Sequence, residues 1–520
     1  MQALQATMCL LVQIVSGFNT TGTNNVAVGA AEYGADYGAL GYNTTGSNNT
    51  ALGKQALLSN TTASNNTAVG MNALRANTTG ASITAVGYNA LTANTTGTSN
   101  VAVGAFALDA NTSATDNTAI GYNALTQNTT GVSNTAVGSS ALYFNSTGTR
   151  NTAVGRTALQ SNVTGNDNTA VGYFALYLNT TSTGNTAVGR DALFNNTGSQ
   201  NTAVGSATLD ANTTGSNNTS LGYATLTSNT TASNDTAVGH KALQFNTTGE
   251  NNVAVGSNAL TSNTTGTYNT AVGHNALSTT TAVNANTGIG YNALGLCTGS
   301  QNTALGYEAG GGVSTGVDNT LIGQRAANYT NNLSTGSDNT VIGSYARLSS
   351  GTVSNELVIG RFALGQGGST GSLGVSGTGV HIAFNGSTTA WSAHSDERLK
   401  ENIVDSTAGL SFINDLRPIT YNWKSKKDIS DEFVNYYDAD SDEPVQGQVK
   451  QTNHGFIAQE VKAAIDAHPE IKEGHSIWRE SPDGIQNLAD GALIPMMVKA
   501  IQELSAQNTE LTTRIEALEG

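Results

Sequence analysis

The stretch NTAVGSSALYFNSTG, residues 134–148, decides the fold of this chain because close copies of it follow one another along most of the 520 residues. The repeating unit is N-T-A-V-G-x-x-A-L-x-x-N-T-T-G-x-x. The glycine at this position of the unit, which follows A-V in most copies, occurs 20 times between Gly29 and Gly360, mostly at a spacing of 17 residues. A fixed period of this length is typical of proteins that stack one small structural unit on the next.

Each unit is too small to bury a core alone, so neighbouring units must stack to form one. The T-A-V step is short and rich in residues that favour strands, and a glycine ends it. The A-L pair supplies a second short apolar step. N-T-T-G has turn composition, since Asn tolerates left-handed backbone angles and glycine adopts them freely. The pattern predicts one coil of a parallel β-roll or β-solenoid per unit, with two short strands and two turns.

The side-chain pattern of the strands predicts contact with another chain. In T-A-V, the Thr and Val side chains point to one face and the Ala side chain to the other. Neither face is strongly charged, and the Ala and Leu positions stay small or apolar in nearly every unit. We therefore expect one face to pack inside the coil and the other to pack against a second copy of the chain.

The repeated A-V-G-x-x-A unit resembles the head repeats of trimeric autotransporter adhesins. The resemblance covers residues 19–365 and implies a trimeric, left-handed parallel β-roll. The 17-residue unit is longer than the repeats of those heads. It therefore leaves open the handedness of the coil and the number of strands in it.

The N-T-T triplet of nearly every unit also matches the acceptor motif for N-glycosylation. A sugar on each coil would be crowded, because stacked strands lie only about 5 Å apart. We therefore favour ladders of stacked Asn and Thr side chains that satisfy backbone groups at the coil corners.

Charge divides the chain into two parts. Residues 1–389 contain 9 Lys and Arg and 13 Asp and Glu, whereas residues 390–520 contain 12 and 23. The acidic balance argues against a nucleic-acid partner, which requires clustered basic residues. Cys9 and Cys297 lie far apart and the histidines show no ligand spacing, so we expect no metal site and no cofactor. No apolar run is long enough to insert into a membrane.

The repeat leaves three further segments. Residues 1–18 are expected to be a degenerate first repeat or a truncated N-terminus. Residues 366–390 are rich in Gly, Ser and Thr, which predicts a linker or an irregular strand pair. Residues 391–520 form the second, more highly charged domain.

Four blocks in this last domain carry a second resemblance. They are AWSAHSDERLKENI (390–403), GLSFINDLRPITYNWK (409–424), GFIAQEV (455–461) and ALIPMMVKAIQEL (492–504). In this order they resemble the intramolecular chaperone domain of phage endosialidase tailspikes and of many phage tail fibres. The resemblance implies an α+β domain that trimerises, drives assembly of the stalk and then releases itself by serine chemistry.

Carried onto this chain, the resemblance makes Ser395 the nucleophile, Lys400 its base and His394–Ser395 the bond that is cut. A serine hydroxyl needs a base to attack a carbonyl, and a lysine serves only when its pKa is lowered by burial or by nearby positive charge. Without the resemblance, Ser395 before two acidic residues would be interpreted as a helix N-cap, with Lys400 in solvent. His394 is expected only to precede the cut, and His454 to pack beside the third block.

A heptad pattern ends the chain. Apolar residues alternate by three and four over residues 494–518, which predicts a coiled-coil helix. Ile at a, Leu at d and Asn508 in the seam favour two strands by simple rules. The resemblance implies three.

Together these features predict a self-processing homotrimeric phage tail fibre or spike, with no enzymatic activity in the stalk. We expect it to act in the virion at the host cell surface after synthesis in the host cytoplasm. The expected partners are other tail proteins and a host receptor, either a glycan or an outer-membrane component. The alternatives are a bacterial surface adhesin, or a fibre whose chaperone stays attached uncleaved. The acidic residues of the stalk are too scattered for a polysaccharide-cleaving carboxylate pair.

Overall fold

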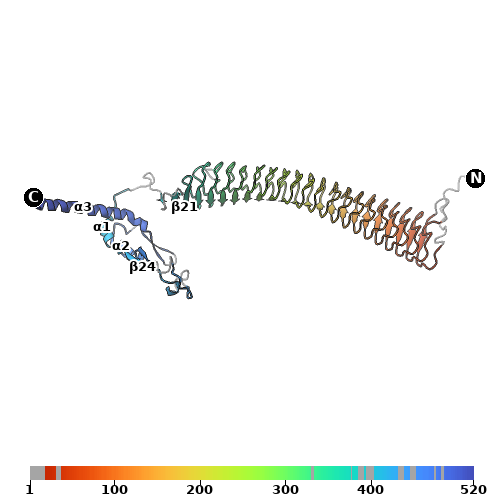
Figure 1. Ribbon diagram of the computed structural model, residues 1–520, viewed down its shortest axis with the longest axis horizontal. Coiled ribbons are helices and arrows are strands. Elements are labelled where there is room, and N and C mark those ends of the chain that lie inside the picture. The colour runs from red at the N-terminus through yellow and green to blue at the C-terminus, as the bar shows by residue number, and fades with distance from the viewer. Residues whose placement is uncertain are drawn as a thin grey trace, which may run out of the picture. The chain divides into compact units, whose positions relative to one another are not determined.

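The computed structural model describes residues 18–30, 37–328, 333–375, 378–383, 392–393, 403–430, 438–445, 452–472, 476–481 and 485–519. The chain divides into two compact units, Met1–His394 and Ser395–Gly520. The first is a long stack of coils, with its strands on one side of the stack (Figure 1).

Each coil of the first unit contributes one strand of three residues to a continuous parallel sheet. The strands are β1 (Val26–Val28), β2 (Thr50–Leu52), β3 (Thr67–Val69), β4 (Thr84–Val86), β5 (Val101–Val103), β6 (Thr118–Ile120), β7 (Thr135–Val137), β8 (Thr152–Val154), β9 (Thr169–Val171), β10 (Thr186–Val188), β11 (Thr202–Val204), β12 (Thr219–Leu221), β13 (Thr236–Val238), β14 (Val253–Val255), β15 (Thr270–Val272), β16 (Thr287–Ile289), β17 (Thr303–Leu305), β18 (Thr320–Ile322), β19 (Thr340–Ile342) and β20 (Leu357–Ile359).

Neighbouring strands of the sheet pair equivalent positions of successive repeat units. In β7 and β8, Ala136 lies beside Ala153 and Val137 beside Val154, one unit further along the chain. Alternation along the strand turns Ala136 into the core, where it is fully buried, and leaves Val137 half-buried on the outside. The predicted mainly β stalk of 17-residue coils is confirmed.

The prediction of two strands per coil was wrong. The A-L pair lies in a turn, with Leu142 at a left-handed φ of 50° and its side chain fully buried. Its N–H still bonds to the next coil, at 3.0 Å from the carbonyl oxygen of Ala158. Leucine can therefore fill the core from a turn conformation that does not occur in a strand. Its apolar character alone does not distinguish the two conformations.

The glycine after A-V is required by both conformation and space. Gly138 has a φ of +137°, which L side chains rarely adopt, and a Cβ added there would lie 2.4 Å from the carbonyl oxygen of Gly155 in the next coil. The coils approach each other too closely at this corner for any side chain.

Two ladders of buried asparagines run through the core of the stalk. The side-chain amide of Asn145, from N-T-T, donates to Oδ1 of Asn128 in the preceding coil (2.9 Å) and to the Gly148 carbonyl (3.0 Å). Asn134, which opens the unit, donates to the same carbonyl (2.8 Å), and its Oδ1 accepts the N–H of Asn151 (3.0 Å). All four asparagines are fully buried, so the ladder interpretation of N-T-T is confirmed.

The last coil closes the second ladder with a carboxylate. Glu356 takes the position of the opening asparagine and is 1 % exposed. Its N–H donates to Oδ1 of Asn339 (3.0 Å), and its carboxylate accepts the N–H groups of Ser349 (3.0 Å) and Gly367 (2.6 Å). These bonds join the turn before Glu356 and the turn after β20 to the ladder.

Beyond β20 the sheet changes from parallel to antiparallel pairing. β21 (Thr370–Val375) pairs in parallel with β20 and antiparallel with β22 (Thr378–Ala383). β22 in turn pairs antiparallel with β23 (Ser392–Ala393). The Gly/Ser/Thr-rich segment therefore contains a strand pair.

The second unit combines short helices and strands. Its elements are α1 (Leu410–Asn414), β24 (Ile419–Tyr421), η2 (Lys426–Asp428), β25 (Asn453–Gly455), α2 (Ala458–Ala467), β26 (Trp478–Glu480), β27 (Gln486–Leu488), η3 (Asp490–Leu493) and α3 (Ile494–Glu519). β24 pairs with β25 and β26 with β27, both antiparallel. A small core gathers Phe412, Val461, Ile465 and Leu493 from α1, α2 and η3. None of the helices in the described ranges could cross a bilayer.

Candidate functional site

The predicted catalytic residues His394, Ser395 and Lys400 lie outside the described residues. The Ser-Lys dyad and the bond to be cut therefore stay predictions. What the structure describes is the chain on either side, from β23 up to Ala393 and from Ile403 onward.

The predicted bond falls at a structural boundary. β23 ends at Ala393, which lies beside Val380 of β22 in the stalk sheet. The two compact units meet in the sequence between His394 and Ser395. Cleavage of this bond would divide the chain between the units without interrupting any described strand or helix.

The structure places two other histidines outside the predicted dyad. His454 is exposed on β25, opposite Thr420, so its interpretation as a packing residue was wrong. His381 lies opposite Ser392 in the sheet, and its Nδ1 hydrogen-bonds with Oγ of Ser372 at 2.9 Å.

His468 forms a charge cluster that the sequence analysis missed. It caps α2, with Nε2 2.8 Å from Oδ2 of Asp415 and Nδ1 2.9 Å from Oε1 of Glu470. Its ring lies edge-on to Phe412, at 5.4 Å between centroids. The hydrogen bonds to Asp415 and then to Glu470 raise the pKa of His468, because both ring nitrogens donate to carboxylates when the imidazole is charged. Asp415 is 53 residues away, so no local motif reveals the pair.

This cluster predicts that the second unit loses stability as pH rises. The charged form of His468 is favoured in the folded state. Its contribution to stability is therefore complete below the usual histidine pKa of about 6.5 and is lost as the pH rises through the raised pKa of the folded state. Hydrogen exchange of α1 and α2 in the full chain, corrected for the intrinsic rate, should show protection falling over this range. His468→Gln should remove most of that dependence. An unchanged pH profile in the variant would contradict the assignment.

The C-terminal helix α3 exposes the predicted heptad seam. Its first turns pack on the unit, where the Glu503 carboxylate accepts the N–H of Leu410 at 2.8 Å. The seam itself is open along the helix, with Ile501 66 % and Leu518 87 % exposed. The residues that line a groove along this helix all belong to α3.

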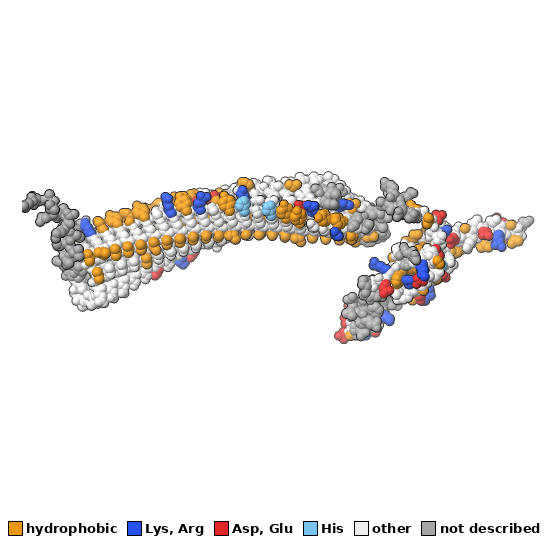
Figure 2. All heavy atoms as spheres, turned by 180° about the vertical axis from the view of Figure 1, so that it is seen from behind, with side chains coloured by type: hydrophobic (Ala, Val, Ile, Leu, Met, Phe, Trp, Pro, Cys, Tyr) orange, Lys and Arg blue, Asp and Glu red, His pale blue; other side chains and the backbone are white. Residues whose placement is uncertain are grey.

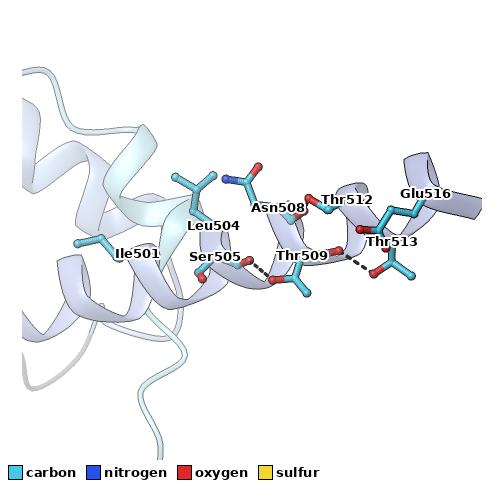
Figure 3. A pocket seen from close by; sticks show the side chains of 8 residues that line it. All are labelled: Ile501, Leu504, Ser505, Asn508, Thr509, Thr512, Thr513 and Glu516. Atoms are coloured by element: carbon cyan, nitrogen blue, oxygen red, sulfur yellow. Dashed lines mark hydrogen bonds between the residues drawn. The ribbon is translucent and has the colours of Figure 1, made fainter. Parts of the chain in front are cut away.

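Figure 3 shows the middle of this groove. Ile501, Leu504 and Asn508 project from the helix, while the hydroxyls of Thr509 and Thr513 donate to carbonyls four residues earlier, each at 3.0 Å. These hydroxyls are satisfied within the helix and do not require a partner. The helix over the predicted range 494–518 is confirmed, and the number of strands that join it stays a prediction.

The outer face of the stalk sheet is uniformly uncharged. The third strand residue is Val, Ile or Leu in every strand from β1 to β20, and the first is Thr, Val or Leu. Many third residues are well exposed, such as Leu52 at 48 % and Leu221 at 47 %. Apolar side chains form continuous lines along the stalk (Figure 2). Within the described ranges, no group of His, Cys, Asp and Glu could hold a metal ion.

Comparison with known proteins gives one family. Residues 395–468 match the model of the peptidase family described as chaperone of endosialidase. The match begins at the predicted nucleophile and ends at His468, so it spans α1, β24, β25 and α2. No curated protein matches the chain. This segment is therefore similar to an endosialidase-type, self-cleaving chaperone.

Proposed function

We propose that the chain is a phage tail fibre or spike whose C-terminal unit assembles the stalk as a homotrimer and then cuts itself off at His394–Ser395. The observation that carries this is a coincidence of three positions. The family match begins at Ser395, the two compact units divide there, and the last strand of the stalk sheet ends two residues earlier.

The chemistry uses Ser395 and Lys400. The neutral amine of Lys400 takes the hydroxyl proton while Oγ of Ser395 attacks the carbonyl carbon of His394. The peptide C–N bond breaks as the protonated Lys400 returns its proton to the leaving nitrogen, so that the acyl group becomes an ester on Oγ and the amino group of Ser395 is freed. Water then hydrolyses the ester, leaving a carboxylate on His394 and the hydroxyl of Ser395 restored. Each molecule cuts once and in its own chain.

The outer sheet face and the α3 seam are the surfaces through which three copies associate. Both are apolar or uncharged along their length, and a fully buried Leu, Ile or Val side chain contributes about 1.5–3 kcal/mol. The seam continues past Asn508, whose amide would face its counterparts and align the helices. The stalk then serves as a rod in the virion, made in the host cytoplasm, held by other tail proteins and directed at a glycan or outer-membrane receptor.

Light scattering of the full chain should give about three protomers. Ile501→Asp places a charge in the seam and should reduce the trimer to monomer or aggregate, because a buried unpaired charge is strongly unfavourable. Ala506→Asp places the same charge five residues along, on the opposite side of the helix, and should leave the trimer intact. A monodisperse monomer of the parent chain would contradict the proposed assembly.

A further inference from the structure

Asp235 interrupts the second asparagine ladder in the middle of the stalk. It takes the position that opens the unit, where most coils have asparagine, and it is fully buried. Its Oδ1 accepts the N–H of Asn252 at 2.8 Å, as an asparagine Oδ1 does elsewhere in the ladder. Its other oxygen replaces an amide nitrogen, so a donor of the ladder is lost.

The lost donor has a defined acceptor. In regular coils the opening asparagine donates to the carbonyl fourteen residues later, as Asn134 does to Gly148 (2.8 Å). The equivalent carbonyl for Asp235 is that of Gly249, which accepts only the amide of Asn246 (2.8 Å) among the described side chains. A protonated carboxyl can donate in place of the amide. An ionised one offers no donor and places its charge in the core.

The neighbouring ladder is also disturbed. The amide of Asn246 donates to Oδ2 of Asp235 at 2.9 Å, whereas the equivalent Asn145 donates to the asparagine of the preceding coil. Oδ1 of Asn229 is consequently buried without a hydrogen-bond donor among the residues that the structure describes. An unsatisfied buried acceptor of this kind is destabilising.

The core just before Asp235 is more polar than elsewhere. Thr208, Ser220 and Thr225 take positions that are alanine in most coils, and their hydroxyls form a fully buried triangle with sides of 2.5, 2.6 and 2.7 Å. The apolar burial that holds coils together is therefore reduced in these two coils.

Among the residues that the structure describes, no positive charge acts on Asp235. Glu250 in the same coil acts on it and disfavours ionisation further. His240 and Lys241 of that coil lie in the outer row after Gly239, and residues 218–234 and 252–268 contain no Asp, Glu, Lys, Arg or His. Burial, against the lowering effect of the Asn252 N–H, raises the pKa of Asp235 to about 7.

We propose that the coil of Asp235 is a proton-dependent break point of the stalk. With the carboxyl protonated, the ladders join the coils on both sides into one continuous stack. With it ionised, the stack opens locally between residues 229 and 252. The device is built into the stalk and does not depend on cleavage at Ser395.

Hydrogen exchange of the full chain between about pH 4 and about pH 8, corrected for intrinsic rates, tests this. The carboxyl is protonated in the closed stack and ionised in the open one between about pH 4 and pH 7, so protection of residues 229–252 should fall up to about tenfold per pH unit there and level off above. Asp235→Asn restores the common residue and should make the profile flat. Asp318→Asn removes an exposed carboxylate and should change nothing.

A second variant should produce the same pH-dependent exchange elsewhere in the stalk. Asn168 occupies the same ladder position in a regular coil and is fully buried. Asn168→Asp should create a second segment of pH-dependent exchange around residue 168. Equal pH profiles for the parent and Asp235→Asn would overturn the proposal, whether or not Asn168→Asp folds.

Discussion

Ser395→Ala is expected to leave the chain whole, whereas the parent should separate into residues 1–394 and 395–520. The variant lacks the oxygen proposed to attack His394, so no ester should form. Lys400→Ala removes the base and should have the same effect. Denaturing gels and mass spectrometry distinguish one piece from two, and N-terminal sequencing of the smaller parent piece should begin at Ser395. The loss of self-cleavage should be complete or nearly so, which makes this one of the two largest effects.

His394→Ala is the matched control, because in the proposed reaction His394 contributes only the carbonyl that is attacked. It should still be cut. If Ser395 were only a helix N-cap, the parent would stay whole and Ser395→Ala would lose roughly 1 kcal/mol of stability. A parent that remains uncut as a folded trimer after long incubation would contradict the dyad and favour a fibre whose chaperone stays attached.

Expression of residues 1–394 alone should give aggregated stalk in place of soluble trimer. The reason lies in the register of the sheet: shifting a strand by one whole unit again places Ala beside Ala and Val beside Val, as in the native pair β7 and β8. Misaligned stacks are therefore close in energy to the correct one, and non-local β pairing is slow and prone to aggregation. A unit that brings three chains together at one end would set the starting point.

The measurement compares soluble yield, light scattering and protease resistance of residues 1–394 with those of full-length Ser395→Ala. The latter keeps the second unit attached and controls for cleavage. Soluble, protease-resistant trimers from residues 1–394 would mean that the stalk assembles without a chaperone.

Sequence periodicity predicted the stalk because one strand, T-A-V, repeats with its glycine. It failed at the A-L pair, because Leu142 adopts a left-handed φ of 50°. Burial of its side chain can stabilise this conformation, but the residue type does not predict it. The asparagine ladder was predicted because sugars on successive coils would be crowded. Its position inside the core was not predicted, because it depends on hydrogen bonds between the side-chain amides of neighbouring coils. In the second unit, His468 and Asp415 come together only through the packing of α1 and α2. Their spacing in the sequence therefore does not predict the hydrogen bond between them.

The crowding at Gly138 has a consequence for how such stalks change over evolutionary time. Because most coils offer the same backbone carbonyl and the same ladder amides on both sides, duplicating or deleting one regular unit repeats contacts that the stalk already makes. Rod length can therefore drift freely by recombination between repeats. The 20-residue step between Gly323 and Gly343 leaves the strand register unchanged, since Thr320 still pairs with Thr340. The length of the stalk is thus adjustable in increments of one coil, about 4.8 Å each.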